Sequence, residues 1–313
     1  MKKKFLTILR ELCLVNKDPM FQVRVPASTA NLGSGFDSIG LAVNLYCTLT
    51  VAKADVWSFE FCGDAGIRDL PLEKNLIYKV IVSMAEKYGC KPIPHHIVVH
   101  TDIPLERGLG SSAAALIGGI EVANEIFSLG LTRDEKLANA IPFEGHIDNI
   151  GAALFGGLLI GTAFNDEFYY ASFDFPTCDC LAIVPPYALS TEDSRKVLPE
   201  NFSRAEAVKG SGIANVLVAA LAKGDMELAG KMMMKDVWHE PYRAKLMPEL
   251  KQLKAKAGDL HIYAALISGA GSTMFVFAKS GDGMRVLKEM ECLFPHCKLL
   301  QLEVDTVGAV VIR

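Results

Sequence analysis

The sequence predicts an α+β protein of two domains, and three observations support this prediction. The chain has 313 residues, which is about twice the length of a common single domain. Hydrophobic residues make up 50% of it and charged residues 22%, which is the balance of a globular protein with a large core. Strand and helix patterns alternate with hairpins in each half, as they do in α+β domains.

The first half begins with strands and leads into a glycine-rich segment. Residues 21–25 alternate apolar and polar side chains, which predicts a strand that ends at Pro26. Helical spacing of apolar residues predicts a helix over 76–88 that Gly89 ends. Further strands are expected over residues 41–52, 56–61 and 96–101, and an apolar helix is expected from the end of segment 105–115 to about Phe127.

The next stretch leads to the expected domain boundary. Thr132 and Glu135 form a capping box, which predicts a helix that ends near Gly145. The longest uncharged stretch, over residues 149–165, is too short and too rich in glycine for a membrane helix. Its glycine-rich part over 151–163 predicts a pair of buried strands with a tight turn. A hairpin turn is expected at 165–170. We therefore expect an N-terminal extension over residues 1–19, an N-terminal domain over 20–165 and a C-terminal domain over 166–313.

The second half has a pattern of its own, in which strands again alternate with helices. Strands are expected over residues 179–184, 262–267, 273–278, 299–302 and 308–313. Helices are expected over residues 203–223, 226–235, 242–257 and 283–292.

Charge and cysteine content exclude several classes of protein. Lys and Arg number 32 against 36 Asp and Glu, a net charge of −4, so we expect no nucleic-acid partner. The 8 cysteines are scattered, which favours buried thiols in a reducing cytoplasm over a disulfide scaffold. The lysines at the start precede a short apolar run with charged interruptions, so we expect no signal peptide and no membrane partner.

The segment over residues 108–113 has the composition of an anion site. Gly108 and Gly110 remove side chains where a ligand could approach the backbone, and hydroxyls and a helix N-terminus follow. Phosphate is the commonest biological anion for such a site. The alternative is a plain helix-capping turn with Ser111 as the cap. Neither the Walker pattern nor the dinucleotide fingerprint is present.

Three segments together resemble the GHMP kinases. Residues 104–114 resemble the phosphate-loop motif P-x-x-x-G-L-G-S-S-A-A of that family at every fixed position. Residues 26–37 are similar to the N-terminal motif of its homoserine kinase branch, and residues 268–273 are similar to its C-terminal glycine-rich motif. The resemblance implies an N-terminal domain like ribosomal protein S5 domain 2, a ferredoxin-like C-terminal domain, and a site in the cleft between them.

Three further segments resemble that branch of the family. They are Glu144-Gly-His-Ile-Asp-Asn149, Ser190-Thr-Glu-Asp-Ser-Arg195 and Glu240-Pro-Tyr-Arg243. The sequence departs from the family pattern at Ser34, Ile147 and Ser272, where proline is usual. These departures lie between motif positions, so they affect loop rigidity and fine substrate preference rather than the class of reaction.

The resemblance implies an ATP-dependent kinase that phosphorylates the side-chain hydroxyl of L-homoserine in threonine biosynthesis. Such a substrate needs arginine forks for its carboxylate and an acid or amide for its ammonium. The implied substrate contacts are Asn31, Asp37, His146, Asn149, Thr191, Arg195, Arg243, Gly269 and Gly271. The implied ATP contacts are Pro104, Leu105, Glu106, Arg107, Gly108, Leu109, Gly110, Ser111, Ser112, Ala113 and Ala114.

The remaining roles concern the metal and the chemistry. The family pattern implies Mg²⁺ held by Ser112 and Glu144, with Asp148 and Asn149 as catalytic residues. Asp148 is either a general base or a structural acid that orders its loop, because phosphoryl transfer does not require a strong base. The alternative hypotheses are a mevalonate-type or sugar kinase of the same family, or a catalytically silent binding protein. The resemblance also brings the expectation of a homodimer.

Overall fold

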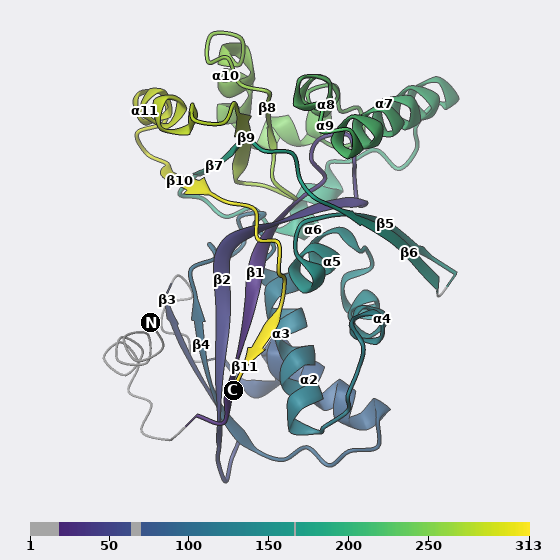
Figure 1. Cartoon of the computed structure of the whole chain (residues 1–313), viewed down its shortest axis with the longest axis vertical. Helices are drawn as coiled ribbons and strands as arrows, with labels where there is room; N and C mark the ends of the chain where they lie inside the picture. Colours follow the sequence, from purple (N-terminus) through teal and green to yellow (C-terminus); the bar gives the residue numbers. More distant parts are fainter. Residues whose placement is uncertain (1–18, 64–69, 166) are drawn as a thin grey trace.

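The computed structural model of the chain describes residues 19–63, 70–165 and 167–313. The predicted extension over residues 1–19 lies outside the described residues except for its last position. The described chain forms two sheets with their helices, one sheet in each half of the molecule (Figure 1). This confirms the predicted α+β class.

The first sheet contains seven strands in the described part of the chain. They are β1 (Phe21–Ala30), β2 (Ile39–Lys53), β3 (Ser58–Gly63), β4 (His95–Thr101), β5 (Leu158–Phe164), β6 (Glu167–Phe173) and β11 (Val310–Ile312). Their order is β11-β1-β2-β4-β3. Strand β5 pairs with the first residues of β2, and β6 pairs with β5. Strand β1 continues through Pro26, beyond its predicted end, because a register shift between Pro26 and Ala27 accommodates the proline.

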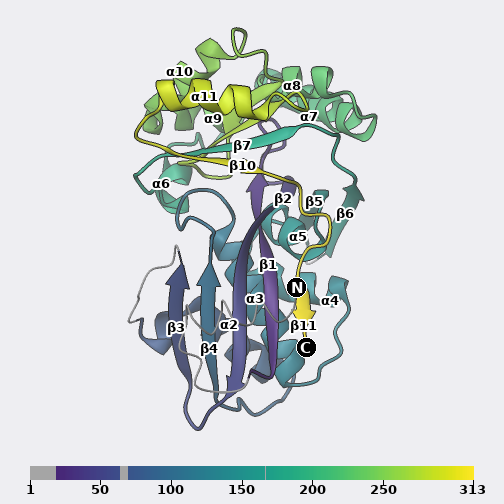
Figure 2. The same cartoon turned by 60° about the vertical axis from the view of Figure 1, so that its left-hand side comes forward.

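The C-terminal strand β11 returns from the second half of the chain to pair with β1 (Figure 2). Strand β6 also belongs to the first sheet, although it follows the predicted boundary at residue 165. The first sheet thus takes strands from both sides of that boundary, and the division of the chain into 20–165 and 166–313 stays a prediction.

Helices cover one face of the first sheet. They are α2 (Leu76–Lys87), α3 (Ser111–Ile126), α4 (Arg133–Glu144) and α5 (Asp148–Phe155). Helices α3 and α5 contact β1 and β2 directly. The capping box predicted at Thr132 and Glu135 is present at the start of α4, and Gly145 ends that helix in the left-handed conformation. The core between these helices and the sheet is made of fully buried aliphatic side chains.

The predicted pair of strands over 151–163 is wrong in its first half. Residues 148–155 form helix α5, and only residues 158–164 form a strand. Nearly every residue of α5 is buried, so its apolar run has no alternation to distinguish a helix from a strand. Gly156, at a φ of +77°, ends the helix and turns the chain into β5.

The second sheet has four antiparallel strands in the described residues. They are β7 (Asp179–Val184), β8 (Ala264–Ile267), β9 (Met274–Ala278) and β10 (Lys298–Leu302). Their order is β10-β7-β9-β8. Helices connect β7 to β8 and β9 to β10, which is the split βαβ arrangement of the predicted ferredoxin-like domain.

The helices of the second half are α6 (Thr191–Lys196), α7 (Arg204–Ala222), α8 (Met226–Met233), α9 (Glu240–Arg243), α10 (Pro248–Lys256) and α11 (Gly283–Leu293). Helices α10 and α11 close a hydrophobic cluster on one face of the second sheet. Side chains on its other face join the core of the first half. Both faces of this sheet are therefore covered.

The predicted helix over 242–257 is interrupted. Residues 244–246 form a 3-10 turn between α9 and α10, and Met247 has extended angles of φ −136° and ψ 80°. The cause is Pro248, because a proline disfavours the helical conformation of the residue before it.

Helix α7 is long and apolar enough to cross a membrane by length and composition alone, and no other helix in the described ranges is. It packs against α8 (Figure 1). One helix of this kind is weak evidence for a membrane span.

Candidate functional site

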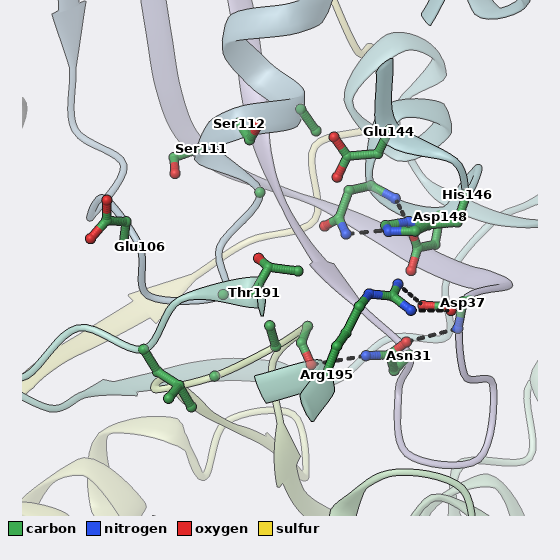
Figure 3. Close-up of a pocket in the computed structure, with 18 of the residues that line it drawn as sticks. Asn31, Asp37, Glu106, Ser111, Ser112, Glu144, His146, Asp148, Thr191 and Arg195 are labelled. Carbon is green, nitrogen blue, oxygen red and sulfur yellow. Dashed lines mark hydrogen bonds and ion pairs between the residues drawn. The ribbon is translucent and has the colours of Figure 1, made fainter. Parts of the chain in front are cut away.

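A cavity lies where loops from the two halves of the chain meet (Figure 3). One side comes from the loop after β1 and the starts of α3 and α5, and the other comes from α6, α9 and the loop after β8. Its lining residues are Asn31, Asp37, Glu106, Gly108, Gly110, Ser111, Ser112, Ala113, Glu144, His146, Asp148, Asn149, Leu189, Thr191, Arg195, Arg243, Gly269, Ala270 and Gly271.

The cavity brings together every residue that was predicted to contact the substrate, both predicted metal ligands and both predicted catalytic residues. Figure 3 shows Ser111 and Ser112 on one side, Asn31 and Arg195 on the other, and Thr191 between them. Side chains from positions more than 200 residues apart in the sequence, such as Asn31 and Arg243, thus line one space.

Only some of the residues predicted to bind ATP, those of segment 104–114, line the cavity. Six of its residues line the cavity: Glu106, Gly108, Gly110, Ser111, Ser112 and Ala113. Pro104, Leu105 and Arg107 line a neighbouring hollow instead, and the Arg107 guanidinium donates to the carbonyls of Pro185 and Pro186. Leu109 and Ala114 are fully buried in the core. The cavity is therefore reached by the glycine turn and the start of α3.

The turn before α3 requires its glycines. Gly108 and Gly110 have φ values of +76° and +68°, in the left-handed region that favours glycine. A Cβ on Gly108 would overlap the carbonyl oxygen of Ser268, and one on Gly110 would overlap Ser28 Oγ. The N-cap of α3 is Gly110, with no side-chain capping bond, so the alternative of a turn capped by Ser111 is wrong. The N–H groups of the first turn consequently remain available for an anion.

Hydrogen bonds connect three glycine-bearing segments around this turn. Ser268 Oγ lies 2.7 Å from the oxygen of Gly108 and 2.8 Å from Thr29 Oγ1. The Gly269 N–H donates to the oxygen of Ala30 over 3.1 Å, and the Thr273 N–H donates to the oxygen of Arg107 over 3.0 Å. The segments 26–37, 104–114 and 268–273 therefore form one wall.

Two of the departures from the family pattern take part in similar contacts. Ser34 Oγ donates to the oxygen of Met232 over 2.9 Å, and Ser272 Oγ donates to the oxygen of Tyr187 over 2.7 Å. Each serine thus attaches its loop to a segment that is distant in the sequence.

Asp37 and Asn31 shape the part of the cavity next to the loop after β1. The Arg195 guanidinium donates to the two oxygens of Asp37 over 2.9 and 3.1 Å. Asn31 Oδ1 accepts from the Asp37 N–H, and Asn31 Nδ2 donates to the oxygen of Gly269, both over 2.9 Å. The carboxylate of Asp37 is thereby held at the cavity wall.

Arg243 is the second guanidinium of the cavity, and its surroundings differ from those of Arg195. It is 2% exposed and forms no ion pair with any residue that the structure describes. Burial and the nearby charge of Arg195 lower the pKa of Arg243 to about 10, so the group stays cationic at neutral pH. A buried cation without a counter-ion is costly, and an anion in the cavity would compensate it.

An acid and a histidine face each other at the start of α5. His146 Nδ1 lies 2.7 Å from Asp148 Oδ1. Burial alone would lower the pKa of His146, but the bond to Asp148 and the charges of Asp148, Asp37 and Glu144 outweigh it and raise this pKa to about 9. His146 is therefore protonated at neutral pH. Asp148 Oδ1 also accepts from the N–H of Asn149 over 2.7 Å, which is the role of an acid that orders its loop.

Asn149 joins this group to the glycine turn. Its Oδ1 accepts from Ser28 Oγ over 2.8 Å, so its amide orientation is fixed. Its Nδ2 lies 3.3 Å from Asp148 Oδ1. The remaining hydrogen of Nδ2 can be offered to a ligand in the cavity.

Glu144 is the residue whose surroundings best suit a metal ion. Its carboxylate makes no hydrogen bond or ion pair within the described ranges, and burial raises its pKa above the usual range. Carboxylate and hydroxyl oxygens are the ligands that Mg²⁺ prefers, and Ser112 lies nearby in the cavity (Figure 3). The donor atoms of Asp37, His146 and Asp148 also lie within 4.8 Å of one another. Those three side chains, however, are already engaged by each other and by Arg195.

Two residues that support the site, Phe36 and His239, are not among the residues predicted from the sequence to form it. The ring of Phe36 lies under both guanidiniums, 5.8 Å from Arg195 and 5.3 Å from Arg243. His239 stacks on Phe36 and bonds Arg243. Phe36 lies inside the segment 26–37, so its position next to Asp37 in the sequence indicates that it lies near the site. Nothing in the local sequence of His239 indicates its contact with the cavity wall.

Two family domains match this chain. Residues 75–157 match the GHMP kinases N terminal domain, and residues 217–296 match the GHMP kinases C terminal domain. The first range includes the glycine turn and the start of α5. The second includes α9 and the loop after β8.

Curated relatives cover nearly the whole chain. Homoserine kinase from Bacillus pumilus is 43% identical over 292 residues, which is 93% of this chain and 94% of the relative. Homoserine kinase from Listeria innocua is 44% identical over 293 residues, which is 93% of this chain and 100% of the relative.

Solved structures show the same fold. Homoserine kinase from Cytophaga hutchinsonii superposes with a TM-score of 0.83 at 27% identity, covering 93% of this chain and 97% of that one. Mevalonate kinase from Methanococcus jannaschii superposes with a TM-score of 0.71 at 17% identity, covering 92% and 99%. The second likeness concerns the fold alone.

Proposed function

This chain belongs to the GHMP kinase family, and we propose that it transfers the γ-phosphoryl group of ATP to the side-chain hydroxyl of L-homoserine, giving O-phospho-L-homoserine, ADP and a proton. The observation that carries the proposal is the position of Arg195 and Arg243 in the same cavity as the free N-terminus of α3. An amino acid with a hydroxyl group and a phosphate donor are the ligands that such a pair of subsites fits. The curated relatives support this choice.

The phosphates of ATP would bind at the glycine turn. Donors from the first turn of α3 would hold the β- and γ-phosphates, since the helix dipole favours negative charge there. Residues 104–107 would extend this contact along the loop. A net negative protein can bind ATP in this way because the charge is shared by backbone groups.

Mg²⁺ would be held by Ser112 and Glu144. The metal ion would neutralise charge on the transferred phosphoryl group. The unpartnered carboxylate of Glu144 and its place in the cavity with Ser112 support this assignment.

The homoserine carboxylate would bind Arg243, which has no carboxylate of its own. Arg195, with its charge largely matched by Asp37, would contribute a second contact beside Thr191. The ammonium would lie near Asp37 and Asn31, since both present oxygen atoms at the wall. Gly269 and Gly271 would close this end of the cavity through their backbone.

Phosphoryl transfer then depends on positioning and charge. Protonated His146 would stabilise the negative charge on the transferred phosphoryl group, and Asn149 Nδ2 would orient the hydroxyl. Asp148 would hold His146 and Asn149 through its Oδ1, and phosphoryl transfer does not require it to act as a strong base as well.

The same proposal includes the biological setting that the family resemblance implies. The reaction would serve threonine biosynthesis in the cytoplasm, and the protein would act as a homodimer.

An ADP-release assay tests the proposed substrate against the alternatives. Purified protein with ATP and Mg²⁺ is offered L-homoserine, mevalonate, galactose or shikimate, each against a reaction without acceptor. We expect turnover with L-homoserine alone. Release with mevalonate or galactose but not with homoserine would replace the proposal by a mevalonate-type or sugar kinase, and no release with any acceptor would favour a silent binding protein.

A further inference from the structure

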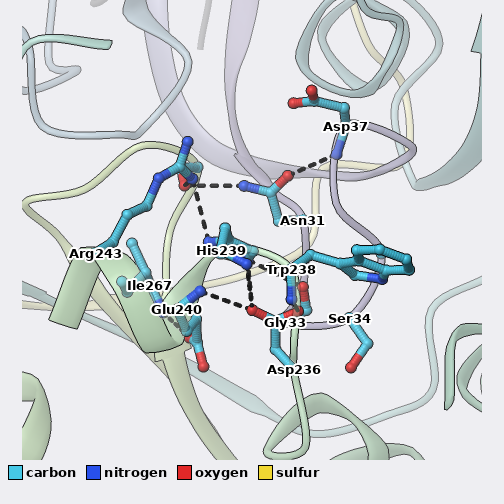
Figure 4. Close-up of polar contacts among 12 residues, drawn as sticks. Asn31, Gly33, Ser34, Asp37, Asp236, Trp238, His239, Glu240, Arg243 and Ile267 are labelled. Carbon is cyan, nitrogen blue, oxygen red and sulfur yellow. Dashed lines mark hydrogen bonds and ion pairs between the residues drawn. The ribbon is translucent and has the colours of Figure 1, made fainter. Parts of the chain in front are cut away.

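His239 is a buried residue that contacts the cavity only through Arg243. Its side chain is 0% exposed and does not line the cavity. Its Nδ1 lies 3.1 Å from Arg243 Nη1, and its Nε2 lies 3.0 Å from the oxygen of Gly33 (Figure 4). The imidazole therefore connects the predicted carboxylate ligand to the loop after β1.

The two contacts fix the state of the imidazole. The oxygen of Gly33 can only accept, so Nε2 carries a hydrogen. Arg243 can only donate, so Nδ1 must accept and must carry no hydrogen. A protonated ring would place an N–H of His239 against an N–H of Arg243. The neutral Nε2–H tautomer is the form that satisfies both neighbours.

The electrostatic surroundings agree with a neutral ring. Burial lowers the pKa of His239 to about 4. The positive charges of Arg243 and Lys254 lower this pKa further, whereas the negative charge of Asp236 raises it. Glu240, next in the chain, forms an ion pair with Lys254. His239 thus stays neutral through the pH range in which kinases are assayed.

The hydrogen bonds of Arg243 show what this contact does. Its Nε donates to the oxygen of Ser194 over 3.1 Å. Its Nη1 donates to the oxygen of Gly269 over 3.0 Å and to His239. Three of the five N–H groups of a guanidinium are therefore used by the protein. Both hydrogens of Nη2 remain, and Nη2 makes no bond within the described residues.

The ring of His239 is itself held in place. It stacks on Phe36, with centroids 5.2 Å apart and planes at 20°, and Phe36 also lies under Arg243. Asp236 accepts from the backbone N–H groups of His239 and Glu240, which fixes the start of α9. The position of the imidazole is thus determined from three directions.

We propose that His239 is a positioning residue, whose neutral ring orients the Arg243 guanidinium so that Nη2 faces the carboxylate of the substrate. This inference rests on the proposed function for the identity of that carboxylate. The orientation of Arg243 is less constrained when His239 cannot accept, because Nη1 then keeps only the oxygen of Gly269 as a partner.

Steady-state kinetics of two variants test the inference. In His239→Phe the stacked ring is kept and both hydrogen bonds are removed. We expect KM for L-homoserine to rise about tenfold, which corresponds to about 1.4 kcal/mol, with KM for ATP and kcat changed less than about twofold. His239→Gln offers an acceptor and a donor, so it should recover part of the loss.

His95→Phe is the matched control. His95 is another buried histidine, 4% exposed, whose Nδ1 bonds the oxygen of Ile93 outside the site. A general loss of packing would affect both histidine variants alike. An unchanged homoserine KM in His239→Phe, or a rise that His95→Phe matches, would overturn the inference.

Nitrogen NMR of the imidazole rings gives a readout that does not depend on the substrate. At pH 7 the wild-type spectrum should contain one buried neutral Nε2–H ring that His239→Gln removes. A protonated ring or an Nδ1–H tautomer would overturn the inference even if His239→Phe fails to fold. A wild type that does not phosphorylate homoserine would instead refute the proposed function, while this spectrum would still decide the state of His239.

Discussion

Asp37 accepts two hydrogen bonds from the guanidinium of Arg195, of 2.9 and 3.1 Å. This fork matches the charge of Arg195 within the protein, whereas Arg243 is buried with no carboxylate partner among the described residues. The two arginines of the site are therefore not equivalent. An anionic ligand would therefore stabilise the charge of Arg243 more than that of Arg195.

Substitution of the two arginines should show this difference. Arg243→Ala should raise KM for L-homoserine about 100-fold, near the upper end of the ~1.5–3 kcal/mol typical of a hydrogen bond to a charged group. Arg195→Ala should raise it about tenfold, since its charge is already shared with Asp37. Steady-state kinetics with each substrate varied measure both effects. KM for ATP should change less than about twofold.

Arg204→Ala is the control for these variants, because Arg204 is exposed at the start of α7. It should leave both KM values unchanged. Equal effects of Arg195→Ala and Arg243→Ala on homoserine would contradict the assignment of the carboxylate to Arg243.

Asp148→Asn should lower kcat by less than about tenfold. An essential general base contributes about 10² to 10⁴ in rate, but Asp148 is bonded to His146 and to the N–H of Asn149, and asparagine can still accept one of these bonds. Measurement of kcat at saturating ATP and homoserine decides the matter. A loss of a thousandfold or more would make Asp148 the base.

His146 should make stability depend on pH. Its pKa is raised from 6.5 to about 9, so its contribution is fully present below about pH 6.5 and is lost as the pH rises through about 9. Urea unfolding of the wild type and of His146→Gln across this range measures it. The stability advantage of the wild type should shrink toward high pH. A difference that stays constant from pH 6 to pH 10 would mean that folding does not raise the pKa of His146.

Gly108→Ala should weaken ATP binding and destabilise the protein. The left-handed φ of +76° costs an alanine about 1–2 kcal/mol, and the added Cβ would displace the carbonyl of Ser268. Thermal unfolding and KM for ATP measure the two effects. Gly212→Ala is the matched control, because a Cβ there meets nothing within 4 Å. It should stabilise α7 by about 0.5–1 kcal/mol without changing KM for ATP.

Local patterns in the sequence predicted much of this structure. Some features depend only on residues close together in the sequence, so their spacing predicts their geometry. Examples are the capping box of Thr132 and Glu135 and the turn at Gly108 and Gly110. The short helix α6 was not predicted, although Ser190 and Asp193 carry an N-cap signal.

Features that depend on distant contacts could not be predicted in this way. Helix α5 is buried on all sides, so its residues carry no periodic signal. The pairing of β11 with β1 joins opposite ends of the chain. The bond between His239 and Gly33 spans 206 residues. The motifs of the site residues resemble a family and so indicate the site, whereas the contacts of His239 with Arg243 and Gly33 appear only in the three-dimensional structure.

The proton-coupled ³¹P NMR spectrum of a reaction with protein, ATP, Mg²⁺ and L-homoserine tests directly whether this chain phosphorylates homoserine. We expect a new phosphate monoester resonance, split into a triplet by the neighbouring CH₂ group, that grows as the γ-phosphate signal of ATP declines. We also expect this resonance to appear more slowly with Arg243→Ala at low homoserine. Loss of the γ-phosphate that gives ADP and inorganic phosphate but no phosphate monoester, or no change in the spectrum, would contradict the proposed reaction.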